Sequence, residues 1–227
     1  MENRFFNRLV SVSLFQGLST DDFMQIAERV HFDFRTISEG ATIVREGEAC
    51  ERLICSLTGT VCKEERCDNG SYFFREYNAL PTLFQPERLF GLRPRHTATF
   101  TAASEVQIMS IPKQEVREIL FQCVPFHINY LNHVCSVQHL WENRLWQAEP
   151  DTLEQKFLRF ILLRSSRPAG HKELIIDMIA LAQELSTTRL RVSHMLNTLA
   201  QTGMVELRRR HINIPSLEAL LQHIQSL

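Results

Sequence analysis

The side chains best suited to bind anions gather near the C-terminus. Three consecutive arginines, Arg208 to Arg210, follow a stretch rich in Arg, His and hydroxyl groups, and Glu206 is the only acidic residue between Ser186 and Ile214. Guanidinium groups pair with phosphate oxygens and with the edge of guanine, so this composition favours nucleic-acid chemistry. A charge run is more often a solvated surface, so the interpretation depends on the elements that carry it.

Apolar spacing predicts two helices joined by a short turn at this place. Leu181, Ala182 and Leu185 share one face of a first helix, and Ser186 to Thr188 are residues that cap a new helix. Val192, Leu196 and Leu199 then recur at i, i+4 and i+7. This pattern predicts a helix-turn-helix whose second helix enters the major groove of DNA, with an ordinary amphipathic hairpin as the alternative.

A basic hairpin follows the second helix. Residues 204–207 and 212–214 alternate as strands, with residues 208–211 between them. A hairpin with a basic tip beside a recognition helix indicates a winged helix. The predicted DNA-binding residues are Thr188, Arg189, Leu190, Arg191, Ser193, His194, Arg208, Arg209 and Arg210.

The preceding residues predict an α+β chain in three parts. Residues 1–112 are predicted to form a jelly-roll-like barrel with flanking helices, because short alternating runs from about His31 to Ile111 are separated by glycine turns. Residues from about Glu2 to Val30 are predicted helical, with Ser19 to Asp22 capping the helical residues Phe23 to Ala27. Residues 113–147 form one long helix, and residues 148–227 form the winged helix.

The long helix carries a seven-residue repeat. Polar members interrupt it, as in coiled coils that fix their register. The predicted dimer interface is Val124, His127, Leu131, Val134, Gln138, Trp141 and Leu145. A second stripe, Phe126, Tyr130, Val137 and Leu140, fits against the helix's own β-roll. A homodimer would place two recognition helices about 34 Å apart on DNA.

Charge, hydropathy and missing motifs limit the classes of protein to which this chain can belong. From Ala148 to Leu227 the chain has ten Lys and Arg and eight Asp and Glu, a net charge of +2. The remaining residues have fifteen basic and eighteen acidic side chains, a net charge of −3, so the whole chain has a net charge of −1. No apolar run approaches the roughly 20 residues of a membrane span, and no signal peptide is evident, so we expect a cytoplasmic protein without a membrane partner. Phosphate-loop and common hydrolase motifs are missing from the sequence, so we expect no enzyme.

The chain resembles the Crp/Fnr family of bacterial transcription regulators. The segments that resemble the family are Leu14 to Ser19, Glu46 to Glu48, Leu53 to Cys55, Thr58 to Val61, and Ala98 to Ala102 through Pro112, followed by the winged helix. The resemblance implies a β-roll of the cyclic-nucleotide-binding type, a dimerisation helix and a homodimeric, sequence-specific regulator of transcription. It also implies RNA polymerase as a partner. A non-DNA-binding cyclic-nucleotide-binding subunit would share the β-roll but not the winged helix.

The segment that resembles the family's nucleotide site departs from its pattern. Gly91 is followed by Leu92 where family members that bind cyclic nucleotides carry the ribose-binding Glu, and His96 replaces the phosphate-binding Arg. The loop is also shorter, and Glu142 and Asn143 replace a Thr-Ser pair. We therefore expect no cyclic AMP binding. Arg93, Arg95, His96 and Thr97 remain a candidate effector pocket for another anion, with a solvated loop as the alternative.

Redox, metal or haem sensing by the same fold is also open, so the cofactor stays unknown. The N-terminal Cys cluster of Fnr-type members is missing, since the first cysteine is Cys50. Cys50, Cys55, Cys62 and Cys67 flank Thr58 and Gly59 symmetrically, which predicts two cross-strand pairs if these residues form a hairpin, though isolated buried thiols are the simpler outcome. Cys123 and Cys135 fit core positions. His127, His133 and His139 could each ligate haem, but their spacing of six spreads them around the helix.

Overall fold

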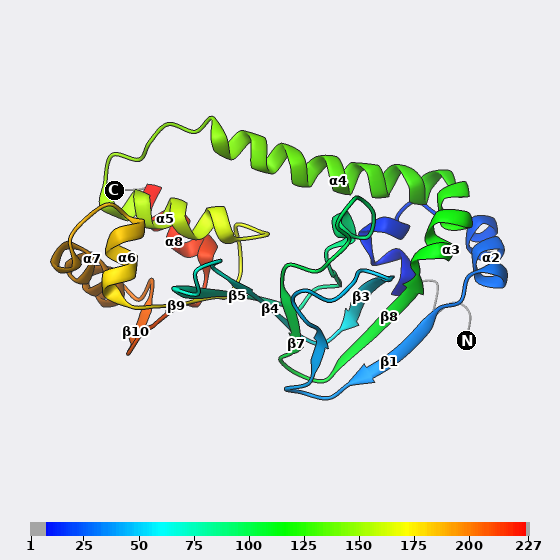
Figure 1. The fold of residues 1–227 in the computed structure, drawn as a ribbon, viewed down its shortest axis with the longest axis horizontal. Coiled ribbons are helices and arrows are strands. Elements are labelled where there is room, and N and C mark those ends of the chain that lie inside the picture. The colour runs from blue at the N-terminus through cyan, green and yellow to red at the C-terminus, as the bar shows by residue number, and fades with distance from the viewer. Residues whose placement is uncertain (1–7, 226–227) are drawn as a thin grey trace. The chain divides into compact units, whose positions relative to one another are not determined.

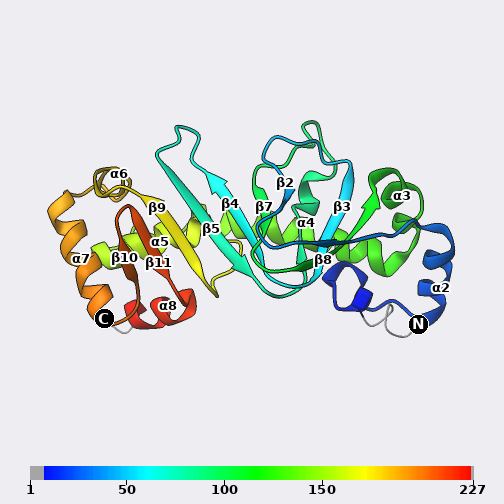
Figure 2. The ribbon, with the colours of Figure 1, turned by 90° about the horizontal axis from the view of Figure 1, so that it is seen from below.

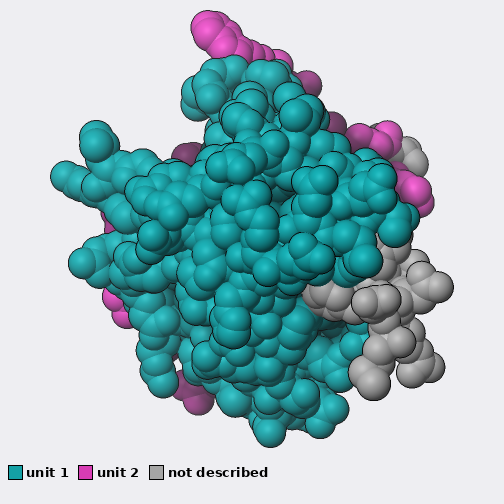
Figure 3. Space-filling view, turned by 90° about the vertical axis from the view of Figure 1, so that its right-hand side faces the viewer, with its two compact units in different colours: residues 1–61, 79–145 teal, residues 62–78, 146–227 magenta. Residues whose placement is uncertain are grey.

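The computed structural model describes residues 8–225 and contains two compact units (Figure 1). Unit 1 comprises residues 1–61 and 79–145, and unit 2 comprises residues 62–78 and 146–227 (Figure 3). The sequence assigned residues 62–78 to the same part as the rest of 1–112, whereas their contacts group them with the C-terminal unit. The predicted helical segment from Glu2 lies partly outside the described residues.

Unit 1 contains antiparallel strands, as the predicted α+β class requires. β1 (Asp33–Ile37), β8 (Val106–Pro112), β3 (Arg52–Thr58) and β6 (Thr82–Leu83) form a four-stranded sheet in the order β1-β8-β3-β6. β2 (Thr42–Val44) pairs with β7 (Thr99–Ala102). Phe84 and Phe100 stack with ring centroids 4.5 Å apart in an apolar core formed by β2, β7, β8 and their neighbours. The α+β prediction is confirmed.

Short helices flank these strands. η1 (Ser13–Phe15) precedes α2 (Thr20–Arg29), and Ser19 caps α2 by accepting a hydrogen bond from the Asp22 backbone N–H while the Asp22 carboxylate accepts from the Ser19 N–H. Such a reciprocal cap satisfies N–H groups that the first helical turn leaves free. The predicted cap at Ser19 is confirmed, and η2 (Pro86–Arg88) is a further short turn in this unit.

The segment predicted as one helix from 113 to 147 is interrupted. α3 (Lys113–Glu118) is followed by η3 (Leu120–Gln122), and Cys123 is extended before α4 (Val124–Leu145) begins. Pro125 fits the new start, because proline has no N–H to donate and is therefore tolerated in the first turn of a helix, where that N–H would have no helical partner. The prediction of an uninterrupted helix was wrong at residues 119–123.

Unit 2 contains one sheet and four helices. Its strands are ordered β10 (Glu206–Arg208), β11 (His211–Ile214), β9 (Lys172–Ile176), β5 (Tyr72–Asn78) and β4 (Val61–Arg66), as Figure 2 shows. The helices are α5 (Leu153–Arg164), α6 (Met178–Glu184), α7 (Arg189–Gln201) and α8 (Leu217–Gln225). All of them contribute side chains to one apolar core, together with Tyr72 and Phe74 of β5.

The predicted hairpin of paired cysteines does not form. Cys55 lies on β3, where it is paired with Met109 of β8 and Leu83 of β6, while Cys62 lies on β4 in a different sheet. The chain leaves one sheet for the other at Gly59, whose φ is +84° and where a Cβ would collide with the Glu105 carbonyl oxygen. The cross-strand cysteine pairs that such a hairpin would form are therefore wrong, and Cys50 and Cys55 are instead free, buried thiols, the simpler outcome named above.

Candidate DNA-binding site

Two helices of unit 2 form the predicted helix-turn-helix. α6 begins after Asp177, whose carboxylate accepts hydrogen bonds from the backbone N–H groups of Ile179 and Ala180 at 3.0 and 2.8 Å. Ser186 takes a left-handed conformation with φ of +51°, which turns the chain from α6 toward α7. Leu181, Ala182 and Leu185 are buried as predicted.

α7 is held by one apolar face. Val192, Leu196 and Leu199 are buried as predicted, and Met195 joins them at the position that the spacing argument missed. Met195 is three residues after Val192, so the i+3 neighbour could have identified it. The Thr188 hydroxyl caps the helix by accepting from the Arg191 N–H at 3.4 Å. These contacts fix which side of α7 faces solvent.

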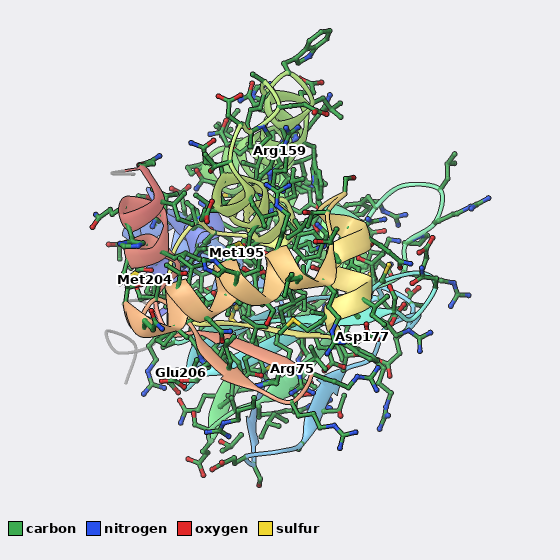
Figure 4. All side chains as sticks on the ribbon, turned by 90° about the vertical axis from the view of Figure 1, so that its left-hand side faces the viewer. Arg75, Arg159, Asp177, Met195, Met204 and Glu206 are labelled. Carbon is green, nitrogen blue, oxygen red and sulfur yellow. The ribbon has the colours of Figure 1, made fainter. Side chains whose placement is uncertain are left out.

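The opposite side of α7 is polar and accessible. Arg189, Leu190, Arg191, His194 and Asn197 are exposed, and Ser193 is half-buried. Within residues 8–225, the structure places no carboxylate within 4.0 Å of the Arg189 or Arg191 guanidinium. Free guanidinium groups on the first turns of such a helix can pair with guanine edges or with phosphates. Figure 4 views this end of the unit, with Met195 on α7 and Glu206 on β10.

The wing is a tight hairpin. Arg208 pairs with His211, so the strands extend further than predicted and only Arg209 and Arg210 form the loop. Arg210 has φ of +58°, and its guanidinium lies 3.6 Å from the Asp177 carboxylate at the start of α6. An exposed ion pair of this kind contributes little to stability, but it places the wing tip beside the helix-turn-helix. The structure thus brings all three predicted wing arginines to one exposed tip.

Polar contacts support the base of the wing. His211 Nε2 lies 3.4 Å from Glu173 on β9, and the Asn213 side-chain amide donates to Glu206 on β10 at 2.9 Å. His171, the residue just before β9, shares a short hydrogen bond with Asn213. These cross-strand contacts hold β10, β11 and β9 together on one face of the sheet.

The start of α5 also lies beside α7. Asp151 to Glu154 line a hollow together with Arg191, His194 and Met195 of α7. Thr152 and Gln155 form a reciprocal cap at this end of α5. Sequence reasoning missed this segment as part of the site, although the spacing of Thr152 and Gln155 is a known sign of a helix start.

The candidate effector residues in unit 1 have different surroundings. Arg93 and Arg95 are exposed, and Arg95 donates to the Gly47 carbonyl oxygen at 2.8 Å. Thr97 is hydrogen-bonded through both backbone N–H and hydroxyl to the buried Gln85 side chain. His96 is 4% exposed and its Nδ1 has no partner among the described residues. Burial lowers the pKa of His96, which favours the neutral ring, so it is poorly suited to replace a guanidinium.

Cys50, Cys55 and Cys62 are poor nucleophiles in these surroundings. Burial raises the pKa of Cys50 and Cys62 to about 11 and that of Cys55 to about 12. The reactive form is the thiolate, which is scarce at neutral pH when the pKa is so high. Among residues 8–225, no three His, Cys, Asp or Glu side chains are placed to hold a metal ion.

One face of α4 is apolar and exposed. Phe126 and Tyr130 are buried in the core of unit 1, and the Tyr130 hydroxyl donates to the Pro86 carbonyl oxygen at 2.6 Å. The residues of the seven-residue repeat face solvent instead: Val124, His127, Leu131, Gln138, Trp141 and Leu145 are exposed, and Val134 is half-buried. In the described chain, no helix has both the length and the apolar character needed to span a membrane.

Comparisons with known proteins agree with the helix-turn-helix. Residues 155–223 match the family model of the Crp-like helix-turn-helix domain, so the predicted helix-turn-helix is confirmed. No curated protein matches the chain.

Solved structures with a similar fold include regulators from three bacteria. The catabolite activator protein of Thermus thermophilus is 18% identical, with 95% of this chain and 99% of that chain covered and a TM-score of 0.45. The sensor domain of the transcriptional regulator DNR from Pseudomonas aeruginosa is 19% identical, with 66% of this chain and 97% of that chain covered and a TM-score of 0.49. The c-di-GMP-responsive regulator CLP of Xanthomonas campestris is 13% identical, with 87% of this chain and 99% of that chain covered and a TM-score of 0.47. All three TM-scores are below 0.5, so the function proposed below rests on the matched segment and on the residues of this chain.

Proposed function

We propose that this protein is a transcription regulator of the Crp/Fnr type that binds a specific sequence of double-stranded DNA. The observation that carries the proposal is the exposed, cationic side of α7 beside the arginine wing, within the segment that matches the Crp-like domain. A helix anchored by four apolar residues presents its polar side as one rigid surface, which suits the major groove.

The residues of this surface divide into two roles. Arg189 and His194 align with family positions that read guanine, and Leu190 stands where the family usually has a cytosine-reading Glu. An apolar side chain there can contact a thymine methyl group instead. Thr188, Arg191, Ser193 and the wing arginines, Arg208, Arg209 and Arg210, contribute phosphate contacts, which position the protein without reading sequence.

A homodimer would complete the site. The exposed repeat runs the 22-residue length of α4 and is mostly apolar, with His127 and Gln138 as polar interruptions, and a second copy of the same helix can cover it. In a two-fold dimer the same stripe meets itself, and the two α7 helices then reach half-sites about one DNA turn apart. RNA polymerase is a further partner that the family resemblance suggests.

Cyclic AMP is not expected to be the effector. Leu92, the residue that replaces the ribose-binding Glu, is fully exposed, and the buried, neutral His96 offers no compensating charge for a cyclic phosphate. An anion that loses its water without gaining such a partner is costly to bury. The stacked Phe84 and Phe100 rings moreover occupy the apolar core beside this loop.

Selection from a random DNA pool with the purified full-length protein tests the proposal. We expect one enriched, two-fold symmetric site. Arg189→Ala should abolish the preference for that site over random DNA. Arg209→Ala should weaken binding to all sequences alike and lower the slope of affinity against salt by about one. Sedimentation should show a dimer, and enrichment of no sequence would refute specific recognition.

A further inference from the structure

A hairpin from the N-terminal half of the sequence is built into the DNA-binding unit. Residues 62–78, here called the inserted hairpin, lie between two segments of unit 1 in the sequence but belong to unit 2. β5 pairs with β9 in continuous register from Tyr72 opposite Ile176 to Glu76 opposite Lys172. The other edge of β9 pairs with the wing strand β11, so one hydrogen-bonded ladder joins the inserted hairpin to the wing (Figure 2).

The inserted hairpin also reaches the first helix of the helix-turn-helix through one arginine. Arg164 at the end of α5 donates to the Tyr72 hydroxyl from Nε at 2.9 Å and pairs with Glu184 at the end of α6 at 3.2 Å. The same guanidinium lies 3.5 Å from the centre of the Phe160 ring. Tyr72 is thus connected to α6 by a single, well-fixed side chain.

A buried ion pair holds the inserted hairpin on β9. Lys172 Nζ lies 2.8 Å from Glu76 Oε1, and each side chain is only 1% exposed. Ser166, just after α5, donates to the Glu76 carboxylate from its backbone N–H and its hydroxyl at 2.9 and 2.7 Å. Burial alone would raise the pKa of Glu76, but the charges of Lys172 and Lys63 and the hydrogen bonds from Lys172 and Ser166 outweigh it and hold that pKa below its usual value.

This arrangement fixes a register. Desolvating two charges is costly, and apolar residues of similar size would often stabilise the fold as well or better. A buried pair nonetheless penalises any slip of β5 along β9, because a slip by one residue would turn Glu76 to the other face of the sheet and leave Lys172 charged and unpaired in the core. The inserted hairpin therefore has one permitted position against the sheet that carries the wing.

We propose that the inserted hairpin is a working part of the DNA-binding unit and that the Glu76–Lys172 pair sets DNA affinity by holding β9 and the wing in their binding geometry. The inference rests on the DNA binding proposed above. The hairpin is joined covalently to the N-terminal half at residues 61–62 and 78–79, so it is a segment through which that half can act on the wing, in addition to the junction at residues 145–146. Glu76 and Lys172 are positioning residues that touch no DNA.

Four full-length variants test the pair. Glu76→Gln leaves Lys172 charged and unpaired while keeping an acceptor for Ser166, and Lys172→Met leaves Glu76 unpaired. The double variant Glu76→Gln with Lys172→Met removes both charges. Asp68→Asn, an exposed change at the tip of the same hairpin, is the matched control for loss of one negative charge.

Hydrogen exchange and DNA affinity are measured on each variant with the duplex that wild-type protein selects. In each single variant we expect exchange in β5, β9 and β11 to become roughly tenfold faster together, while β3 and β8 are unchanged. The dissociation constant should rise by about tenfold with an unchanged salt slope, because the phosphate contacts are the same in number. The double variant should return to within about threefold of wild type, and Asp68→Asn should match wild type.

Three outcomes would overturn the inference. The first is faster exchange confined to residues 62–78, the second is wild-type DNA affinity in both single variants, and the third is additive effects in the double variant. Wild-type protein that selects no DNA would instead refute the proposed function and the affinity half of the inference, while the exchange measurements would still decide whether the hairpin and wing strands open as one unit.

Discussion

Leu190 provides a sharp test of how this protein would read DNA. It is the second residue of α7, and its side chain is 80% exposed. Only about a fifth of the side chain is buried, so replacing it by Glu forfeits about 0.3–0.6 kcal/mol of the 1.5–3 kcal/mol that full burial of a leucine contributes. A negative charge in the first turn of a helix offsets this by about 0.3–1 kcal/mol. The folded state of Leu190→Glu should therefore be as stable as wild type.

Recognition should change although stability does not. A glutamate at this position can accept a hydrogen bond from the amino group of cytosine, whereas leucine can contact only apolar groups such as the thymine methyl. A correct base contact contributes about 1–3 kcal/mol of discrimination, or roughly 5- to 150-fold in the ratio of dissociation constants. We expect Leu190→Glu to select a different base pair at one position of each half-site.

The assay is selection from a random DNA pool with wild-type and Leu190→Glu protein, followed by affinity measurements on duplexes that differ in that one base pair. Ile179→Glu is the control, since Ile179 is the second residue of α6 and is also exposed. It introduces the same charge at the same helical position and should weaken binding to all sequences without changing the selected base. Recovery of the same half-site by wild type and Leu190→Glu would refute the assignment of Leu190 to a base contact.

Three further predictions concern assembly and stability. Leu131→Asp should raise the dissociation constant of the dimer by about 100-fold or more, because a two-fold interface would bury the unpaired charge twice. Sedimentation measures this constant, and a value equal to that of wild type would contradict the proposed role of α4. Gly59→Ala should destabilise the protein by at least about 1–3 kcal/mol in denaturant unfolding, because φ is +84° and the new Cβ would meet the Glu105 carbonyl, whereas Gly70→Ala, at φ of +70° with open space, should cost less. The free energy of unfolding of wild type should exceed that of Glu76→Gln by its full amount above the unfolded-state pKa of about 4.5. The excess should shrink as pH falls below that value, because the folded-state pKa of Glu76 is lowered. An excess that does not change with pH between 3 and 6 (roughly the range in which a carboxyl titrates) would show that the Glu76 charge is not what stabilises the fold.

Much of the DNA-binding element could be predicted because its determinants are local. Apolar residues three and four apart fix the buried face of a helix, so Val192, Leu196 and Leu199 were identified without knowledge of their partners. Ser19 and Thr188 could be recognised as caps because a cap bonds to backbone groups only two or three residues away. Met195 was not identified, although it lies three residues after Val192 and the same spacing rule predicts that it is buried.

Strand partners depended on the tertiary structure instead. The symmetric cysteines around Gly59 suggested that β3 pairs with β4. However, the alternation of apolar and polar residues in a strand does not identify its partner strand, and a turn can lead to another sheet as readily as back along the same one. β3 pairs with β8, which lies some fifty residues later in the sequence. Pro125 is a local sign of the break before α4, but the break was not predicted because the apolar residues on both sides of it fit one continuous helix.

The sequence by itself determined which residues form the helix-turn-helix and its wing, since those depend on periodicity, capping and charge within short segments. Only the tertiary structure decided that residues 62–78 complete the sheet of the DNA-binding unit. Nothing local marks Glu76 and Lys172 as partners, because they are 96 positions apart and a charged residue in a strand usually faces water. Their pairing exists only where the core of unit 2 excludes water from both side chains at once.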